Sequence, residues 1–130
     1  MSVIHVAAAI IQNDKGEILI CQRGPGGACA HLWEFPGGKI EPGETPEQCV
    51  LRECKEELDI TIQLTERYAD FSYEYPQQKI EFTFFKAKLS QGELQQNVHE
   101  NLKWVLPKDF ENYPFCPADK DLVKQLQEQG

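Results

Sequence analysis

The order of apolar and polar positions divides the chain into strands and helices. Residues 3–12 are mostly apolar and small, which predicts a strand buried on both faces. A turn signal at 13–16 is followed by a second strand pattern at 17–22, so we expect these two strands to form a hairpin. Residues 24–30 are rich in glycine and alanine and predict a loop, and residues 32–35 predict a short apolar element.

A helix is most clearly predicted at residues 45–58. Thr45 suits the N-cap position, and Pro46 then occupies the first helical position, where its missing N–H costs nothing. Gln48 lies three residues after Thr45 and completes a capping box. We therefore expect a helix that begins immediately after Thr45 and ends near Leu58.

This helix has an acidic face and an apolar face. At about 100° per residue, the spacing i, i+3 and i+4 places three carboxylates together, those of Glu53, Glu56 and Glu57. Leu51, Cys54 and Leu58 lie on roughly the opposite side. We expect these three apolar side chains to pack against a sheet.

The second half of the chain adds three strand patterns and one further helix. Residues 68–75 and 80–89 are rich in aromatic and β-branched side chains and predict two strands, and residues 102–106 predict a short one. Residues 118–127 have helical spacing. Strands with two interspersed helices predict a single α/β domain, residues 1–130, with a mixed sheet.

The composition is that of an ordinary globular protein, with 41% apolar and 26% charged residues. No apolar run approaches the roughly 18–20 residues that a membrane span requires, so we expect no membrane partner. Five cysteines without a C-x-x-C pair argue against a disulfide framework or structural zinc and favour a cytoplasmic protein. A net charge of −8 argues against binding to nucleic-acid polymers, and nothing demands more than a monomer.

Acidic residues are concentrated at residues 37–60, with seven in twenty-four positions. One interpretation is the solvated face of a helix, and the other is a cage for cations. Two features favour the cage. Like charges at helical spacing repel one another, and Arg52 is expected to project away from them. Gly37 and Gly38 permit backbone conformations closed to other residues and would bring a carbonyl to the acidic face, giving oxygen ligands suited to Mg²⁺ or Mn²⁺.

The same segment resembles the Nudix box of the Nudix hydrolases. The pattern is Gly38, then five residues to Glu44, seven more to Arg52-Glu53, and two more to Glu56-Glu57. The wider stretch WEFPGGKIEPGETPEQ is similar to the MutT branch, and the similarity covers nearly the full chain. This resemblance implies an α/β/α sandwich with a central mixed β-sheet. It also implies a metal-dependent hydrolysis of nucleoside triphosphates to the monophosphate and pyrophosphate.

The resemblance further implies roles for individual residues. The cation ligands would be the carbonyl of Gly37 and the carboxylates of Glu53, Glu56 and Glu57. Arg52 resembles the arginine that orients the catalytic glutamates, including Glu53 and Glu56, and Glu44 is expected to orient or cap. On a loop before the last strand, Glu100 is a candidate metal ligand or general base, with an exposed loop acid as the alternative. We interpret its neighbour His99 as a surface residue.

Two positions depart from the family pattern. Cys54 stands where an aliphatic residue is usual, and cysteine still packs as a small hydrophobe. Asp59 stands where a glycine is usual, and aspartate adopts the left-handed backbone conformation more readily than most residues. Since neither position is a predicted ligand, we expect an active enzyme.

The resemblance leaves the nucleobase open. The predicted substrate-binding residues are Arg23, Phe35, Gly38, Tyr75 and Asp119. An ionised Asp119 would accept hydrogen bonds from the cytosine N4 amine or from guanine N1–H and the 2-amino group, and the alternative is a simple acid at a helix start. The main prediction is 8-oxo-dGTP, with nucleotide-pool sanitation as the role. CTP, dCTP or 5-methyl-dCTP is the alternative, and a catalytically inactive nucleotide-binding regulator is the second alternative.

Overall fold

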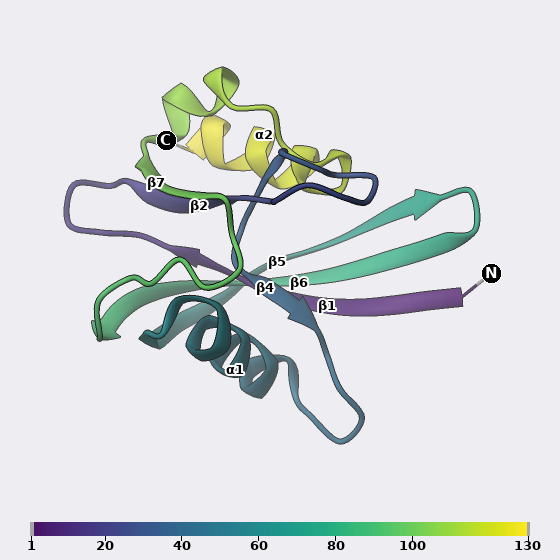
Figure 1. Cartoon of the computed structure of the whole chain (residues 1–130), viewed down its shortest axis with the longest axis horizontal. Helices are drawn as coiled ribbons and strands as arrows, with labels where there is room; N and C mark the ends of the chain where they lie inside the picture. The colour runs from purple at the N-terminus through teal and green to yellow at the C-terminus, as the bar shows by residue number, and fades with distance from the viewer. Residues whose placement is uncertain (1, 130) are drawn as a thin grey trace.

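The computed structural model describes residues 2–129 and places strands between two helices (Figure 1). The strands are β1 (Ser2–Ile11), β2 (Ile18–Gln22), β3 (Trp33–Glu34), β4 (Gly37–Lys39), β5 (Thr61–Tyr75), β6 (Gln78–Gln91) and β7 (Asn101–Val105). The helices are α1 (Pro46–Leu58) and α2 (Lys120–Gln129), with two 3₁₀ helices, η1 (Pro107–Asn112) and η2 (Pro117–Asp119), before α2. The predicted elements therefore exist, although β5 and β6 are longer than the sequence pattern indicated.

Two sheets lie between the helices. The larger has the strand order β4-β1-β6-β5, and the smaller has the order β3-β2-β7. β1 runs parallel to β6 and antiparallel to β4, so that Ala8 lies opposite Phe84 on one edge and Gly37 on the other. The predicted α/β fold with a mixed sheet is confirmed.

β1 is the centre of the core. Ala7, Ala9 and Ile11 pack in the cluster that includes α1, whereas Ala8 and Ile10 pack in the cluster that includes α2. Burial on both faces is thus confirmed for the second half of the strand, because successive side chains point to opposite faces.

The expected hairpin between the first two strands forms only at its turn. The Asn13 amide donates to the Glu17 carbonyl at 2.9 Å, and Gln12 and Ile18 form an isolated antiparallel bridge. Beyond that bridge the two strands belong to different sheets, because β1 pairs with β4 and β6 whereas β2 pairs with β3 and β7.

Both ends of α1 follow from local sequence. The Gln48 amide donates to Thr45 Oγ1 at 3.1 Å, and the Thr45 amide donates to Gln48 Oε1 at 2.9 Å, which confirms the capping box. Asp59 ends the helix with φ 55° and ψ 39°, and its amide donates to the Lys55 carbonyl. The left-handed conformation expected at Asp59 is therefore confirmed.

The buried face of α1 is confirmed at Cys54 and Leu58 but not at Leu51. Cys49, Val50, Cys54 and Leu58 are buried, and three of them follow the spacing i, i+4 and i+8. Leu51 was expected to pack against the sheet, but 40% of it is exposed. Val50, about 100° away from Leu51 around the helix, is buried in its place.

The two glycines before α1 allow close packing of the backbone. A Cβ on Gly37 would lie 2.2 Å from the Ala7 carbonyl oxygen, and one on Gly38 would lie 2.5 Å from the Glu53 carboxylate carbon. Neither glycine is among those with a positive φ. Their expected use of an unusual conformation was therefore wrong, and the absence of a Cβ is what the site requires.

Candidate active site

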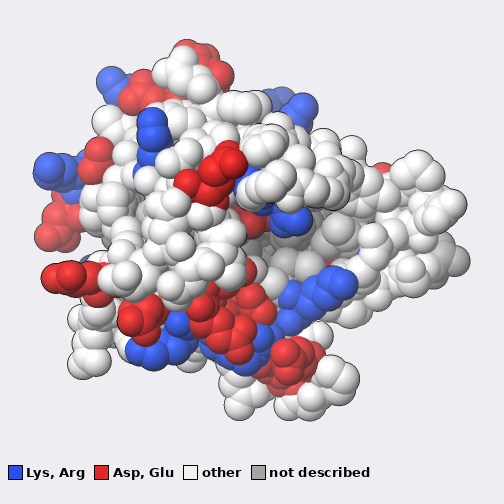
Figure 2. All heavy atoms as spheres, in the orientation of Figure 1, with Lys and Arg blue, Asp and Glu red and all other residues white. Residues whose placement is uncertain are grey.

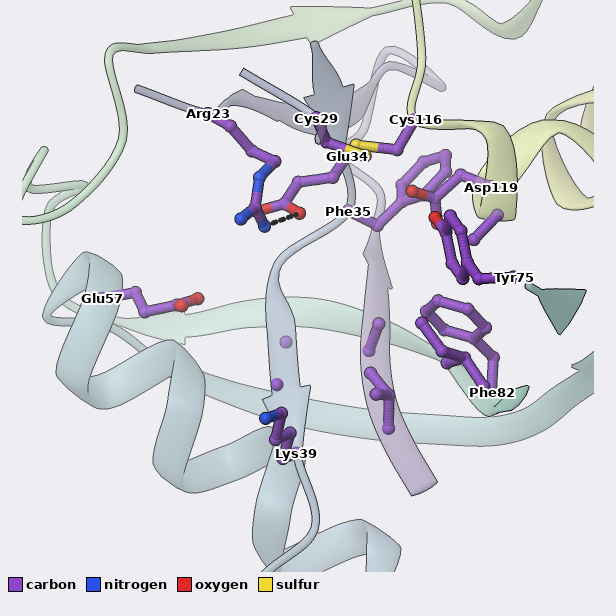
Figure 3. Close-up of a pocket in the computed structure, with 16 residues that line it drawn as sticks. Arg23, Cys29, Glu34, Phe35, Lys39, Glu57, Tyr75, Phe82, Cys116 and Asp119 are labelled. Carbon is purple, nitrogen blue, oxygen red and sulfur yellow. Dashed lines mark hydrogen bonds and ion pairs between the residues drawn. The ribbon is translucent and has the colours of Figure 1, made fainter. Parts of the chain in front are cut away.

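A cavity of about 250 Å³ opens between β1, β6, the β3–β4 segment and η2 (Figure 3). Its lining includes all five residues predicted to bind substrate: Arg23, Phe35, Gly38, Tyr75 and Asp119. It also includes Gly37 and Glu57 from the predicted cation site. The fold thus brings together two sets of residues that lie far apart in the sequence.

One end of the cavity is aromatic. Phe35 is buried and stacks on Phe115, with ring centroids 5.5 Å apart and planes at 22°. Figure 3 shows Phe82, Tyr75 and Asp119 on the same side of the cavity as Phe35. Because the Phe35 ring is packed against neighbours, this wall is rigid and flat, as a nucleobase site requires.

Asp119 is the buried polar group at the aromatic end. Only 5% of it is exposed, and burial, reinforced by the negative charge of Glu34, raises its pKa well above the usual value. These conditions favour the neutral carboxylic acid, which has one O–H donor as well as acceptors. The sequence-based prediction covered only the ionised form of Asp119, and the neutral form would donate as well as accept.

Arg52 organises the acidic end. Its Nε and Nη2 donate to Glu44 at 2.7 and 3.0 Å, and its Nη1 donates to Glu53 at 2.7 Å and to Glu56 at 3.2 Å. These bonds lower the pKa of Glu44 to about 2, with the Arg52 hydrogen bond as the largest cause. The expectation that Arg52 projects away from the carboxylates was wrong, because its long side chain reaches along the helix to them.

Glu57 is the acid that faces the cavity. Its Oε1 is buried and has no hydrogen-bond partner, and burial, followed by the charge of Glu53, raises its pKa to about 8. A buried carboxylate of this kind is stabilised by a cation. The backbone of Gly38 lies directly against the Glu53 carboxylate on the same side of α1.

The oxygen atoms at this end fit a divalent cation, although they are not already gathered around one position. Within residues 2–129, no group of three His, Cys, Asp or Glu side chains stands ready to hold a metal ion. Arg52 accounts for this, because it draws Glu53 and Glu56 to its own guanidinium. The donors remain hard carboxylate and carbonyl oxygens, which suit Mg²⁺ and Mn²⁺.

Glu100 is paired with His31 rather than with these acids. Its Oε2 is 2.9 Å from Nδ1 of His31, and both side chains are largely exposed. Glu100 is not among the residues that line the cavity. As the structure stands, this acid does not reach the acidic end.

Two further site residues were missed in the sequence. Glu34 lines the cavity and pairs with Arg23, its Oε1 lying 3.1 Å from Arg23 Nη1. His99, which we interpreted as a surface residue, is only 7% exposed and lies 3.3 Å from Glu34 Oε2. The alternation of Glu34 with the apolar Trp33 and Phe35 was a usable signal, whereas nothing in the polar loop around His99 indicated burial.

The charge distribution matches this division of the cavity. Figure 2 shows acidic side chains gathered over α1 at the rim of a hollow, with basic side chains beside them. Arg23 and Lys39 both line the cavity. A polyanion can therefore meet fixed positive charge here even though the chain has a net charge of −8.

Known proteins share this fold and this sequence pattern. The model of the NUDIX domain matches residues 2–126. The chain belongs to the Nudix family. This confirms the predicted family and its reaction class, the hydrolysis of phosphoric anhydrides.

Among Nudix relatives, the chain is 39% identical to the 8-oxo-dGTP diphosphatase of Haemophilus influenzae and to the CTP pyrophosphohydrolase of Escherichia coli, over 95% of this chain and 91% of each relative. It is 35% identical to the Escherichia coli 8-oxo-dGTP diphosphatase, over 97% of this chain and 98% of that protein. The solution structure of the Escherichia coli ORF135 protein aligns with a TM-score of 0.81 at 38% identity, over 95% of this chain and 88% of that one.

Proposed function

We propose that this Nudix hydrolase cleaves nucleoside triphosphates to the monophosphate and pyrophosphate with Mg²⁺, and that 8-oxo-dGTP is its main substrate. One observation carries the proposal: a single cavity joins a flat aromatic wall with a buried acid to the acidic helix and its two glycines. A nucleotide has the same order, with a planar base at one end and phosphates at the other. The proposed role is nucleotide-pool sanitation in the cytoplasm, which the five free thiols support.

Glu53, Glu56, Glu57 and the Gly37 carbonyl are the proposed cation ligands. Bound cations would neutralise charge on the phosphates and acidify the attacking water. Nudix hydrolases generally use divalent cations, and Mg²⁺ is proposed because all these ligands are hard oxygens. Glu100 joins this set only if it leaves His31, so we propose it as a ligand or base of the substrate-bound state.

Glu53 is the proposed general base. Arg52 holds one oxygen of its carboxylate at 2.7 Å, and the Gly38 backbone lies against the same group. Both contacts restrict the rotation of the carboxylate, so that a water beside it would be held in one orientation. Arg52 thereby has the proposed role of positioning Glu53 and Glu56.

CTP or 5-methyl-dCTP is the second candidate substrate, and Asp119 is compatible with it. A neutral Asp119 can donate and accept together, which suits the N3 and N4 edge of cytosine as well as the N1 and O6 edge of guanine. The equal identity to a CTP pyrophosphohydrolase and to an 8-oxo-dGTP diphosphatase supports both substrates.

Pyrophosphate release tests the function directly. The protein would be assayed with 8-oxo-dGTP, dGTP, CTP and 5-methyl-dCTP, each with Mg²⁺ and with a chelator. We expect release that depends on Mg²⁺ and a kcat/KM that is highest for 8-oxo-dGTP. A higher kcat/KM for a cytosine nucleotide would replace the main substrate with the second candidate, and release without any divalent cation would refute the mechanism.

A further inference from the structure

Glu34 lies where the two ends of the cavity meet. It is half-buried, and each of its carboxylate oxygens has a separate partner, Arg23 on Oε1 at 3.1 Å and His99 on Oε2 at 3.3 Å. Its negative charge helps raise the pKa of Asp119 at the aromatic end and of Glu57 at the acidic end. Figure 3 shows Glu34 and Arg23 between these two acids.

A second cavity, of about 350 Å³, adjoins the first on the acidic side. It shares Arg23, Glu34 and Glu57 with the first cavity, and His99 belongs to its lining. Arg23 is the only lysine or arginine in that lining. Arg23 therefore places positive charge where the two cavities adjoin, and Lys39 is the other basic residue in the lining of the first cavity.

His99 is held in its buried position by hydrogen bonds. It comes from the loop between β6 and β7, where Val98 is 60% exposed and Glu100 is also exposed, and where Leu94 is the side chain that packs against the apolar core. The loop is fixed beside β2 by a hydrogen bond from the Glu100 amide to the Gln22 carbonyl at 2.8 Å. This bond carries the imidazole inward to Glu34.

The hydrogen bond of His99 indicates which of its ring nitrogens carries the proton. To bond an ionised Glu34, Nε2 must carry the proton and donate. Its Nδ1 is buried and has no partner in the structure of residues 2–129. A core histidine normally satisfies both nitrogens, and here only the bond to Glu34 is made.

We propose that His99 is a positioning residue for substrate binding: its Nε2–H fixes Glu34, and Glu34 holds Arg23 toward the sugar and first phosphate of the bound nucleotide. This role rests on the proposed nucleotide hydrolysis, since it assumes a base at the aromatic end and phosphates over α1. Within residues 2–129, the hydrogen bond of His99 goes to Glu34 and not to a proposed cation ligand. Its removal therefore weakens binding more than it slows the chemical step.

The test measures KM and kcat separately for His99→Ala and His99→Gln with 8-oxo-dGTP and Mg²⁺. The glutamine side chain keeps an N–H donor at similar reach. We expect His99→Ala to raise KM about tenfold, as the loss of one hydrogen bond to a charged group implies, with kcat within about threefold of the wild type. His99→Gln should recover most of that loss. The matched control is His5→Ala, because His5 also faces a carboxylate, Glu81 at 3.6 Å, but is exposed and lines neither cavity.

A double-mutant cycle shows whether His99 acts through Glu34. Glu34→Ala and the double variant with His99→Ala should have the same KM within about twofold, because the second change removes nothing further once the acceptor is gone. Thermal unfolding of every variant separates loss of fold from loss of positioning. If His99→Ala does not fold, His99→Leu, which also lacks a donor, takes its place in the cycle.

Three results would overturn the assignment: an unchanged KM in folded His99→Ala, no recovery in His99→Gln, or additive effects in the cycle. Failure of the proposed function looks different, because the wild type itself would then release no pyrophosphate. In that case the dissociation constant of a non-hydrolysable triphosphate analogue, measured by calorimetry, replaces KM. Equal constants for wild type and His99→Ala, or no binding by the wild type, would then also refute the role of His99.

Discussion

The two ends of the cavity are built in different ways. At the acidic end, α1 and the segment before it supply almost every group, and Arg52 holds four glutamates within one network. At the aromatic end, Phe35, Tyr75 and Asp119 come from three separate segments and are positioned by packing. The acidic end thus concentrates charge that only a cation can balance, whereas the aromatic end is stabilised by burial alone. Changes at the first should affect chemistry, and changes at the second should affect recognition.

The largest effect is expected for Glu53→Gln. This change keeps the shape of the side chain but removes the charge and the basic oxygen, so we expect kcat to fall by about 10³-fold. Steady-state pyrophosphate release measures it, and Glu47→Gln is the control, because Glu47 is an exposed acid in the first turn of the same helix. An unchanged rate in Glu53→Gln would remove Glu53 from catalysis. A wild type that binds nucleotide without turnover would instead indicate a regulator.

The adjacent glycines should separate stability from activity. Gly37→Ala would place a Cβ 2.2 Å from the backbone oxygen of Ala7, so we expect a loss of about 3 kcal/mol in the free energy of unfolding. Gly38→Ala would place its Cβ 2.5 Å from the Glu53 carboxylate, which can move. We expect normal folding and a kcat reduced about 10²-fold. Urea unfolding and steady-state kinetics would be measured for both variants. Equal losses of stability and of kcat in the two variants would contradict this prediction.

Asp119→Asn tests the aromatic end through pH. Burial raises the pKa of Asp119 in the folded state, so the folded protein binds more protons than the unfolded one and loses stability as pH rises between the two pKa values. Asparagine does not titrate. The stability of the variant relative to wild type should therefore rise over that interval, by about 1.4 kcal/mol per pH unit. Parallel curves of unfolding free energy from about pH 4 to about pH 8 would show that Asp119 titrates normally.

The same variant should alter recognition only modestly. Asparagine also donates and accepts, so we expect kcat/KM to change by no more than about tenfold, with the dependence on Mg²⁺ unaltered. The ratio of kcat/KM for 8-oxo-dGTP and CTP, measured for both proteins, is the relevant quantity. A large loss of kcat with an unchanged ratio would place Asp119 in the chemistry.

The smallest effect is expected at the start of α1. Thr45→Ala removes the side-chain acceptor of the Gln48 amide, which should cost about 1 kcal/mol in the free energy of unfolding. Since the catalytic glutamates lie two turns further along, kcat should stay within about twofold. Thr61→Ala, an exposed threonine in β5, is the control for the substitution itself. A tenfold loss of kcat would mean that the helix start positions the acids.

Local sequence patterns predicted which strands and helices form better than they predicted how these elements pair and pack. The cap at Thr45, the left-handed Asp59 and the buried β1 depend on neighbours within a few residues, and all three were confirmed. The partner of β2 depends on which strand edges remain free, and this was not visible in the sequence. Leu51 is a second example, because the side of α1 that is buried depends on how the helix packs on the sheet.

The sequence by itself determined the fold class, the family and the acidic helix, because charge spacing and capping are encoded within one short segment. The tertiary structure decided the contacts of that segment: Arg52 turned toward the glutamates, Glu100 lay with His31, and His99 was buried on Glu34. It also raises the pKa of Asp119, since a pKa depends on surrounding dielectric and charge. Long side chains and buried acids take their roles from neighbours that are distant in sequence, and only the folded chain supplies those neighbours.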